Sequence, residues 1–226
     1  MCDRTPPLSY TIGMKDTVKL DKPTEPTNSA VIFLPGISGG ALTDRFLPVV
    51  DACLAAGMAI ARVNAWEGAD DVGKKNLSEI YESIDEVVEQ LLKEGYTNIY
   101  GIGKSFGGAV MLTLPNGAIT KKVLWAPAIG VTEIGANIDT YLSEPLGSLA
   151  QLTDMKVDRE YLEEKDAETL ILHGTADDVI PYINSEAITS MLPNVVLVPI
   201  PGADHSYKNK EREASVIQKS IDFLRE

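Results

Sequence analysis

The chain has 226 residues, of which 44% are hydrophobic, and this length and composition suit one globular domain with a sizeable core. Its formal net charge of −13 argues against nucleic acids and anionic membranes as partners, because both are bound by clustered Lys and Arg. Two cysteines are too few for a disulfide framework, and residues 1–21 lack the apolar run of a signal peptide, so we expect a cytoplasmic protein.

Predicted strands and helices alternate along most of the chain. Residues 8–20 alternate loosely between apolar and polar side chains, which indicates an edge strand or a hairpin. Six compact apolar runs then predict buried strands, at residues 30–34, 58–64, 98–102, 122–126, 168–173 and 194–200. Helices are predicted at residues 46–56, 76–94, 105–112, 185–192 and 211–224. The alternation predicts an α/β fold, a mostly parallel, doubly wound sheet with helices on both faces, in a single domain over residues 1–226.

Residues 76–94 carry the clearest helical pattern. Apolar side chains recur there at intervals of three and four residues, and Asn76 and Glu79 have the spacing of a capping pair. Gly95 follows directly and is predicted to end the helix. The apolar stripe therefore belongs to the core, and the acidic face to solvent.

The sequence Gly103-Lys-Ser-Phe-Gly107 follows one predicted strand and opens a helix. This G-x-S-x-G pattern at a strand-to-helix turn is typical of a serine held on a sharp, strained bend. The two glycines let strand and helix close up, so the hydroxyl of Ser105 is expected to be exposed. The N–H groups of the new helix would also direct positive partial charge toward it.

This turn has two other interpretations besides a reactive serine. Gly101-x-Gly103-x-x-Phe106 lacks the third glycine of a dinucleotide-binding turn, and no acidic residue follows at the usual distance, so that interpretation is disfavoured. A tight bend without chemistry stays open on the motif alone. The residues that follow the other predicted strands must therefore decide between a reactive serine and a purely structural bend.

Acidic and imidazole side chains follow two further predicted strands. Asp177 comes after the strand at 168–173, and His205 after the strand at 194–200. The order Ser105, Asp177, His205 is the one expected when a later acid and histidine complete a serine on such a turn. A serine hydroxyl needs an imidazole to take its proton, and the imidazole needs a carboxylate to fix its tautomer. The sequence therefore predicts a catalytic triad.

With these parts the chain resembles the α/β-hydrolase superfamily over residues 30–226. The matching pieces are the segment that starts at Pro35, the serine turn, the acid loop and the histidine loop. The resemblance implies a Ser-His-Asp hydrolase that uses no metal or organic cofactor. It also implies an oxyanion hole made of backbone N–H groups, which by position would be those of Ile37 and Phe106.

Three residues near these motifs have simpler interpretations. His173 ends a strand, so we expect a hydrogen-bonded structural residue whose replacement leaves the chemistry largely intact. Asp178 is the alternative acid, but the family spacing favours Asp177. Lys104 is expected to be a partly exposed charge. Because the chain has two histidines and no cysteine pair, a metal site is not expected.

Residues 129–166 form a connection much longer than the usual length of about 2 to 6 residues, and it is rich in apolar side chains. We expect it to form a small cap over Ser105, which would favour small or medium acyl groups. The predicted function is a carboxylesterase-like serine hydrolase that cleaves a small-molecule ester through an acyl-enzyme. Alternatives are a thioesterase or amidase of the same fold, or a catalytically silent binding protein.

Overall fold

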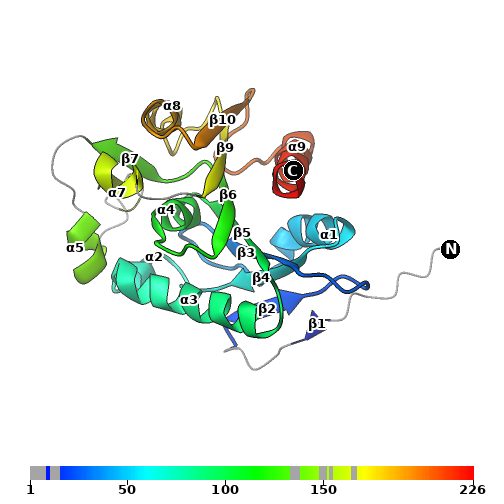
Figure 1. Ribbon diagram of the computed structural model, residues 1–226. Coiled ribbons are helices and arrows are strands. Elements are labelled where there is room, and N and C mark those ends of the chain that lie inside the picture. Colours follow the sequence, from blue (N-terminus) through cyan, green and yellow to red (C-terminus); the bar gives the residue numbers. More distant parts are fainter. Residues whose placement is uncertain (1–8, 11–15, 133–137, 148–151, 153–154, 164–166) are drawn as a thin grey trace.

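The computed structural model describes residues 9–10, 16–132, 138–147, 152, 155–163 and 167–226 (Figure 1). Its centre is an eight-stranded sheet in the order β1-β2-β4-β3-β5-β6-β9-β10. The parallel strands are β3 (Ser29–Leu34), β4 (Ala59–Val63), β5 (Asn98–Lys104), β6 (Ile119–Trp125), β9 (Glu168–Gly174) and β10 (Val195–Ile200). All six lie where the sequence predicts strands, but β10 is an edge strand and is only partly buried, with Val196 exposed.

An antiparallel pair forms one edge of the sheet. β1 (Ser9–Tyr10) pairs with β2 (Val18–Asp21), and β2 pairs in turn with β4. The hairpin alternative for residues 8–20 is therefore the correct one, although residues 11–15 lie outside the described part. Nε and Nη2 of Arg62 on β4 donate to Oδ2 of Asp21 at 3.1 and 3.0 Å. This buried, charge-assisted pair ties β2 to β4.

Helices cover both faces of the sheet, as the sequence predicts (Figure 1). One face carries α1 (Leu47–Ala55), which follows the 3-10 turn η1 (Asp44–Phe46), and α9 (Lys210–Arg225). The other face carries α3 (Leu77–Lys93), α4 (Phe106–Thr113) and α8 (Tyr182–Met191). The buried apolar side chains accordingly form two clusters, one with α1 and α9 and one with α3, α4 and α8.

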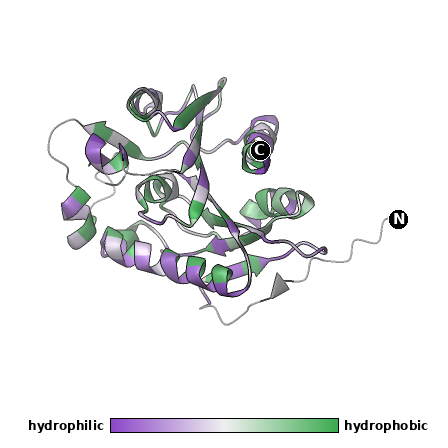
Figure 2. Cartoon of the chain, viewed as in Figure 1, coloured by the Kyte–Doolittle hydropathy of each residue, from purple (hydrophilic) through white to green (hydrophobic). Residues whose placement is uncertain are grey.

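Local signals account for the clearest helix, α3. The side chain of Asn76 accepts from the N–H of Glu79 at 2.9 Å, and the carboxylate of Glu79 accepts from the N–H of Asn76 at 2.9 Å. This reciprocal capping box is the one predicted. Gly95, with φ of 93°, follows the helix in the left-handed conformation that favours glycine. Figure 2 shows hydrophobic and hydrophilic residues recurring along α3, as expected of an amphipathic helix.

The connection between β6 and β9 holds more than a crossover helix. Its described elements are β7 (Ile129–Thr132), α5 (Ile138–Ser143), β8 (Met155–Asp158) and α7 (Arg159–Glu163), and β7 pairs with β8 in a separate parallel sheet. Buried side chains of this segment, such as Leu146 and Leu152, pack into the hydrophobic cluster that includes side chains of α3, α4 and α8, which we call the α4 cluster. Residues 133–137, 148–151, 153–154 and 164–166 lie outside the described part, so a cap over residues 129–166 stays a prediction.

One short helix, α2 (Ala69–Val72), lies between β4 and α3, where no helix is predicted. Trp66, just before it, is fully buried. Within the described ranges, no helix combines the length and the hydropathy needed to cross a membrane.

Candidate active site

Ser105 occupies the sharp turn between β5 and α4. Its φ of 53° and ψ of −119° lie outside the regions that L-residues ordinarily adopt. Its N–H donates to the carbonyl of Trp125 at 2.8 Å, and its carbonyl accepts from the N–H groups of Gly108 and Ala109 at 2.9 and 3.0 Å. The turn is thus the strained bend that the motif predicts. Ser105 is only 8% exposed, however, which is less than expected of a hydroxyl at its tip.

The glycines on either side of the serine are required by close backbone approach. A Cβ on Gly103 would lie 2.3 Å from the carbonyl oxygen of Gly107. A Cβ on Gly107 would in turn lie 2.3 Å from the carbonyl oxygen of Pro35. Backbone atoms cannot give way as a flexible side chain can, so any larger residue would push β5, α4 and the loop after β3 apart.

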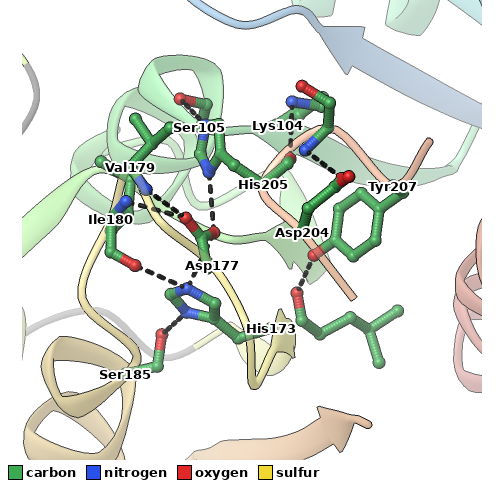
Figure 3. Close-up of polar contacts among 12 residues, drawn as sticks. Lys104, Ser105, His173, Asp177, Val179, Ile180, Ser185, Asp204, His205 and Tyr207 are labelled. Atoms are coloured by element: carbon green, nitrogen blue, oxygen red, sulfur yellow. Dashed lines mark hydrogen bonds and ion pairs between the residues drawn. The ribbon is translucent and has the colours of Figure 1, made fainter. Parts of the chain in front are cut away.

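The structure brings the predicted serine, histidine and acid together, although they follow three different strands (Figure 3). Nε2 of His205 lies 2.9 Å from Oγ of Ser105, and Nδ1 lies 2.8 Å from Oδ2 of Asp177. A carboxylate oxygen can only accept, so Nδ1 of His205 carries a proton and Nε2 of the neutral ring can accept one. The arrangement can therefore take a proton from Ser105.

The carboxylate of Asp177 is fully buried, and both of its oxygens are engaged. Oδ1 accepts from the N–H groups of Val179 and Ile180, both at 2.9 Å. Oδ2 contacts His205 at 2.8 Å and His173 at 3.2 Å. Burial alone would raise the pKa of this carboxyl, but the hydrogen bonds from the two imidazoles and the two amides outweigh it and hold the pKa well below its usual range. Asp177 is therefore an anion at neutral pH.

Asp178 and His173 differ in how they relate to this carboxylate. Asp178 is exposed, and it is the side chain of Asp177 that reaches His205, which is the choice that the spacing favours. His173 is buried and hydrogen-bonded, as expected of a structural residue. His173 nevertheless contacts Asp177, the acid that His205 uses, and no pattern in the sequence predicts this contact.

Lys104 corrects the expectation of a partly exposed charge. Its side chain lies within the fold, 8% exposed, and Nζ donates to the carbonyl of His205 at 3.2 Å. Burial and the nearby charge of Arg45 lower the pKa of Lys104 to about 8, against the opposing influence of Asp177 and Asp204. The lysine thus supports the loop that carries His205.

The backbone beside Ser105 offers N–H groups of the kind that an oxyanion hole needs. Phe106 is the first residue of α4, so its N–H has no acceptor within the helix. A Cβ on Gly36 would lie 3.5 Å from Cβ of Ser105, which puts the peptide before Ile37 next to the serine. Nε1 of Trp66 donates to the carbonyl of Gly36 at 2.9 Å. Because a trans peptide holds its C=O and N–H in opposite directions, this bond also orients the N–H of Ile37.

The burial of Trp66 against Phe106 is not predicted from the sequence. Its indole meets the ring of Phe106 edge to face, with centroids 5.1 Å apart and an interplanar angle of 75°. A lone large aromatic residue directly after a predicted strand is the signal that could have indicated it. Trp66 also lines a cavity of about 520 Å³ together with Val18 and Gln90, whereas Ser105 and its two partners do not line it.

Among the described residues, no group of three or more His, Cys, Asp or Glu side chains comes together in a way that could hold a metal ion.

Comparisons with known proteins bear on this geometry. A family described as "Uncharacterised protein family (UPF0227)" matches residues 72–224. A search of curated proteins finds no match. Similar solved structures include Est1E from Butyrivibrio proteoclasticus, with 20% identity over 92% of this chain and 93% of that one and a TM-score of 0.69. An esterase (EaEST) from Exiguobacterium antarcticum has 18% identity over 92% and 96% of the two chains and a TM-score of 0.68.

A dienelactone hydrolase from Anabaena variabilis ATCC 29413 is also similar, with 16% identity over 97% of each chain and a TM-score of 0.71. Likeness at such identities shows the fold. The chain has the α/β-hydrolase fold in a small single domain, as its motifs predict.

Proposed function

Because the chain belongs to the UPF0227 family, whose description names no activity, we propose its function from the site itself: a serine hydrolase of carboxylesterase type. The observation that carries the proposal is the run of two hydrogen bonds from Ser105 through His205 to Asp177. The esterases and the dienelactone hydrolase among the structural relatives support the same class of reaction. The fold alone would not establish it.

In the proposed reaction, Oγ of Ser105 attacks the carbonyl carbon of an ester. Nε2 of His205 takes the serine proton as the new bond forms, and Asp177 stabilises the resulting imidazolium through its ionised carboxylate. His205 then gives the proton to the leaving alcohol, which leaves an acyl-serine. Water attacks this acyl-serine with His205 again as the base, so the carboxylic acid is released and Ser105 is restored.

The negative charge that develops on the carbonyl oxygen needs fixed donors. We assign them to the backbone N–H groups of Phe106 and Ile37, with the N-terminus of α4 adding positive partial charge. Trp66 supports both donors. Its Nε1–H donates to the carbonyl of Gly36, in the peptide that carries the N–H of Ile37, and its ring contacts the ring of Phe106. All proton transfers and charge stabilisation thus come from the protein, and the proposed reaction calls for no cofactor.

The substrate is proposed to be a small-molecule ester with a small or medium acyl group. This rests on the segment 129–166, which as a cap would be too small to enclose a long acyl tunnel, and whose described buried apolar side chains pack against α3, α4 and α8. A net charge of −13 makes nucleic acids and anionic membranes poor partners, and a cytoplasmic location fits the two cysteines.

A fluorophosphonate probe and a series of p-nitrophenyl esters of increasing acyl length test the proposal. The wild-type protein should be labelled and should hydrolyse the shorter esters, whereas Ser105→Ala should do neither. Ser190→Ala, which removes an exposed hydroxyl on α8, is the matched control and should behave as wild type. Folded wild-type protein that takes no label would instead support a binding protein of this fold.

A further inference from the structure

His173 lies at the end of β9, and Asp177 sits between it and His205 (Figure 3). The ring is fully buried, and both of its nitrogens have partners. Nδ1 lies 2.7 Å from Oγ of Ser185 on α8. Nε2 lies 3.2 Å from the carbonyl oxygen of Ile180 and 3.2 Å from Oδ2 of Asp177. The acid therefore has an imidazole on each side.

These partners define the tautomer of His173. The carbonyl of Ile180 and the carboxylate of Asp177 can only accept, so Nε2 must carry the proton. In the neutral ring Nδ1 is then an acceptor, and the hydroxyl of Ser185 must donate to it. His205 has the opposite tautomer, with its proton on Nδ1. Two imidazoles in opposite tautomers thus contact the same oxygen, Oδ2, and His173 shares its Nε2–H between this oxygen and the carbonyl of Ile180.

Resting on the function proposed above, we propose that His173 is a positioning residue: its Nε2–H holds the carboxylate of Asp177 in the orientation that His205 uses. The two backbone amides on Oδ1 fix one oxygen, and His173 fixes the other from the side opposite His205. With both oxygens held, the carboxylate cannot rotate away from the Nδ1–H of His205. This replaces the expectation that His173 is merely structural.

The same contact limits how strongly Asp177 acts on His205. Oδ2 shares its charge between two donors, and removal of His173 would direct that charge to His205 alone. The protonated form of His205 would then be favoured, and activity would need a higher pH. Among the described residues, the other titratable or charged groups around this pair are Lys104, Asp204 and Tyr207, with Arg45 beside Lys104 and with Tyr182, whose ring centroid lies 5.4 Å from that of His173. The variants below leave all of them in place.

Nuclear magnetic resonance tests the hydrogen bond without any substrate. The chain has only two histidines, so ¹⁵N-histidine labelling gives four ring nitrogens. At about pH 8, where an ordinary histidine is neutral, one ring should be protonated at Nε2 and the other at Nδ1. His173→Gln assigns them, because the Nε2–H signal should disappear. Two rings with the same tautomer would overturn the proposal.

Kinetics test the consequence with a matched pair of variants. His173→Gln keeps an N–H donor near the position of Nε2, whereas His173→Leu keeps the volume and removes the donor. Rates are divided by the number of sites that the fluorophosphonate probe labels, so unfolded protein does not count. We expect kcat to fall about 10- to 100-fold in His173→Leu with little change in KM, since a hydrogen bond to a charged group is worth about that much. His173→Gln should recover most of the loss.

The pH profile separates positioning from packing. The midpoint of the acidic limb of kcat/KM should move to higher pH in His173→Leu and return toward the wild-type value in His173→Gln. A packing role would lower the melting temperature and the number of labelled sites in both variants but leave kcat per site and the midpoint unchanged, and that result would overturn the proposal. If the wild type hydrolyses nothing, the proposed function fails, while the ring-nitrogen signals of His205 still test the contact, because they should shift in His173→Leu and return toward the wild-type positions in His173→Gln.

Discussion

Nε2 of His205 lies 2.9 Å from Oγ of Ser105, although 100 positions of the chain separate the two residues. The contact spans four consecutive parallel strands of the sheet, because Ser105 follows β5 and His205 follows β10, with β6 and β9 between them. The carboxyl ends of parallel strands meet at one edge of a sheet, so the loops that follow them converge. The loop of His205 is supported from β5 by Nζ of Lys104.

Loss of Ser105 or His205 should each reduce turnover by several orders of magnitude. The double variant Ser105→Ala with His205→Ala should be little worse than either single variant, because the members of a proton-transfer unit act together. Steady-state hydrolysis of a short p-nitrophenyl ester measures all three. Near-additive losses would argue that the two residues act independently.

The two adjacent aspartates should differ sharply. Asp177→Asn should cost roughly 10⁴-fold in kcat, because an amide cannot stabilise the imidazolium and favours the wrong tautomer of His205. Asp178→Asn should leave kcat near the wild-type value, since Asp178 is exposed. Circular dichroism checks that both variants fold. A larger loss in Asp178→Asn would make the acid assignment wrong.

Much of this arrangement follows from the sequence because the signals are local. Alternation of apolar runs predicts the parallel strands, the capping pair predicts α3, and the glycines around Ser105 predict the strained turn. Two contacts at the site were not predicted from the sequence. The contact of Lys104 with the carbonyl of His205 is long-range, and no periodicity or motif encodes it. The contact of His173 with Asp177 is local, but it depends on the turn of the loop after β9, where the N–H of Asp177 donates to the carbonyl of Gly174. The burial of Trp66 was not predicted either.

Gly107 should not tolerate a methyl group. In Gly107→Ala the new Cβ would meet the carbonyl oxygens of Pro35 and Leu34 at 2.3 and 2.7 Å, so α4 and the loop after β3 would have to move apart. We expect the free energy of unfolding to fall by about 3 kcal/mol or more in urea denaturation. Gly117→Ala is the control, because a Cβ there meets nothing within 4 Å. Equal stability of the two variants would show that the turn can relax.

Lys104 should make stability depend on pH. Burial lowers its pKa in the folded protein to about 8, whereas the unfolded chain keeps the value of 10.5. Between these values the unfolded state binds more protons, so the free energy of unfolding should rise with pH across that window. Lys104→Met removes this contribution. We therefore expect the stability of the wild type relative to the variant to increase between pH 7 and 10.5, by up to roughly 3 kcal/mol.

The measurement for Lys104 is urea denaturation of both proteins at several pH values. All other titrating groups are shared, so their contributions cancel in the difference. Parallel curves for the two proteins would mean that Lys104 keeps an ordinary proton affinity inside the fold, and that its ammonium is better solvated than its burial indicates.

The segment 129–166 should influence which acyl chains reach Ser105. Leu142 is half-buried against the α4 cluster, and Leu146 is 2% exposed with its N–H bound to the carbonyl of Lys75. Shortening either side chain should open space above the serine. We expect Leu142→Ala and Leu146→Ala to shift kcat/KM per labelled site toward longer p-nitrophenyl esters, while the rate of fluorophosphonate labelling changes little.

Stability must be measured beside selectivity, since Leu146→Ala removes a buried side chain and should cost about 2 to 4 kcal/mol. Leu92→Ala, an exposed leucine on α3, is the control and should change neither property. Lower stability with unchanged selectivity in both test variants would make the segment part of the core rather than a cap. The acyl pocket would then have to lie nearer Ile37 and Trp66.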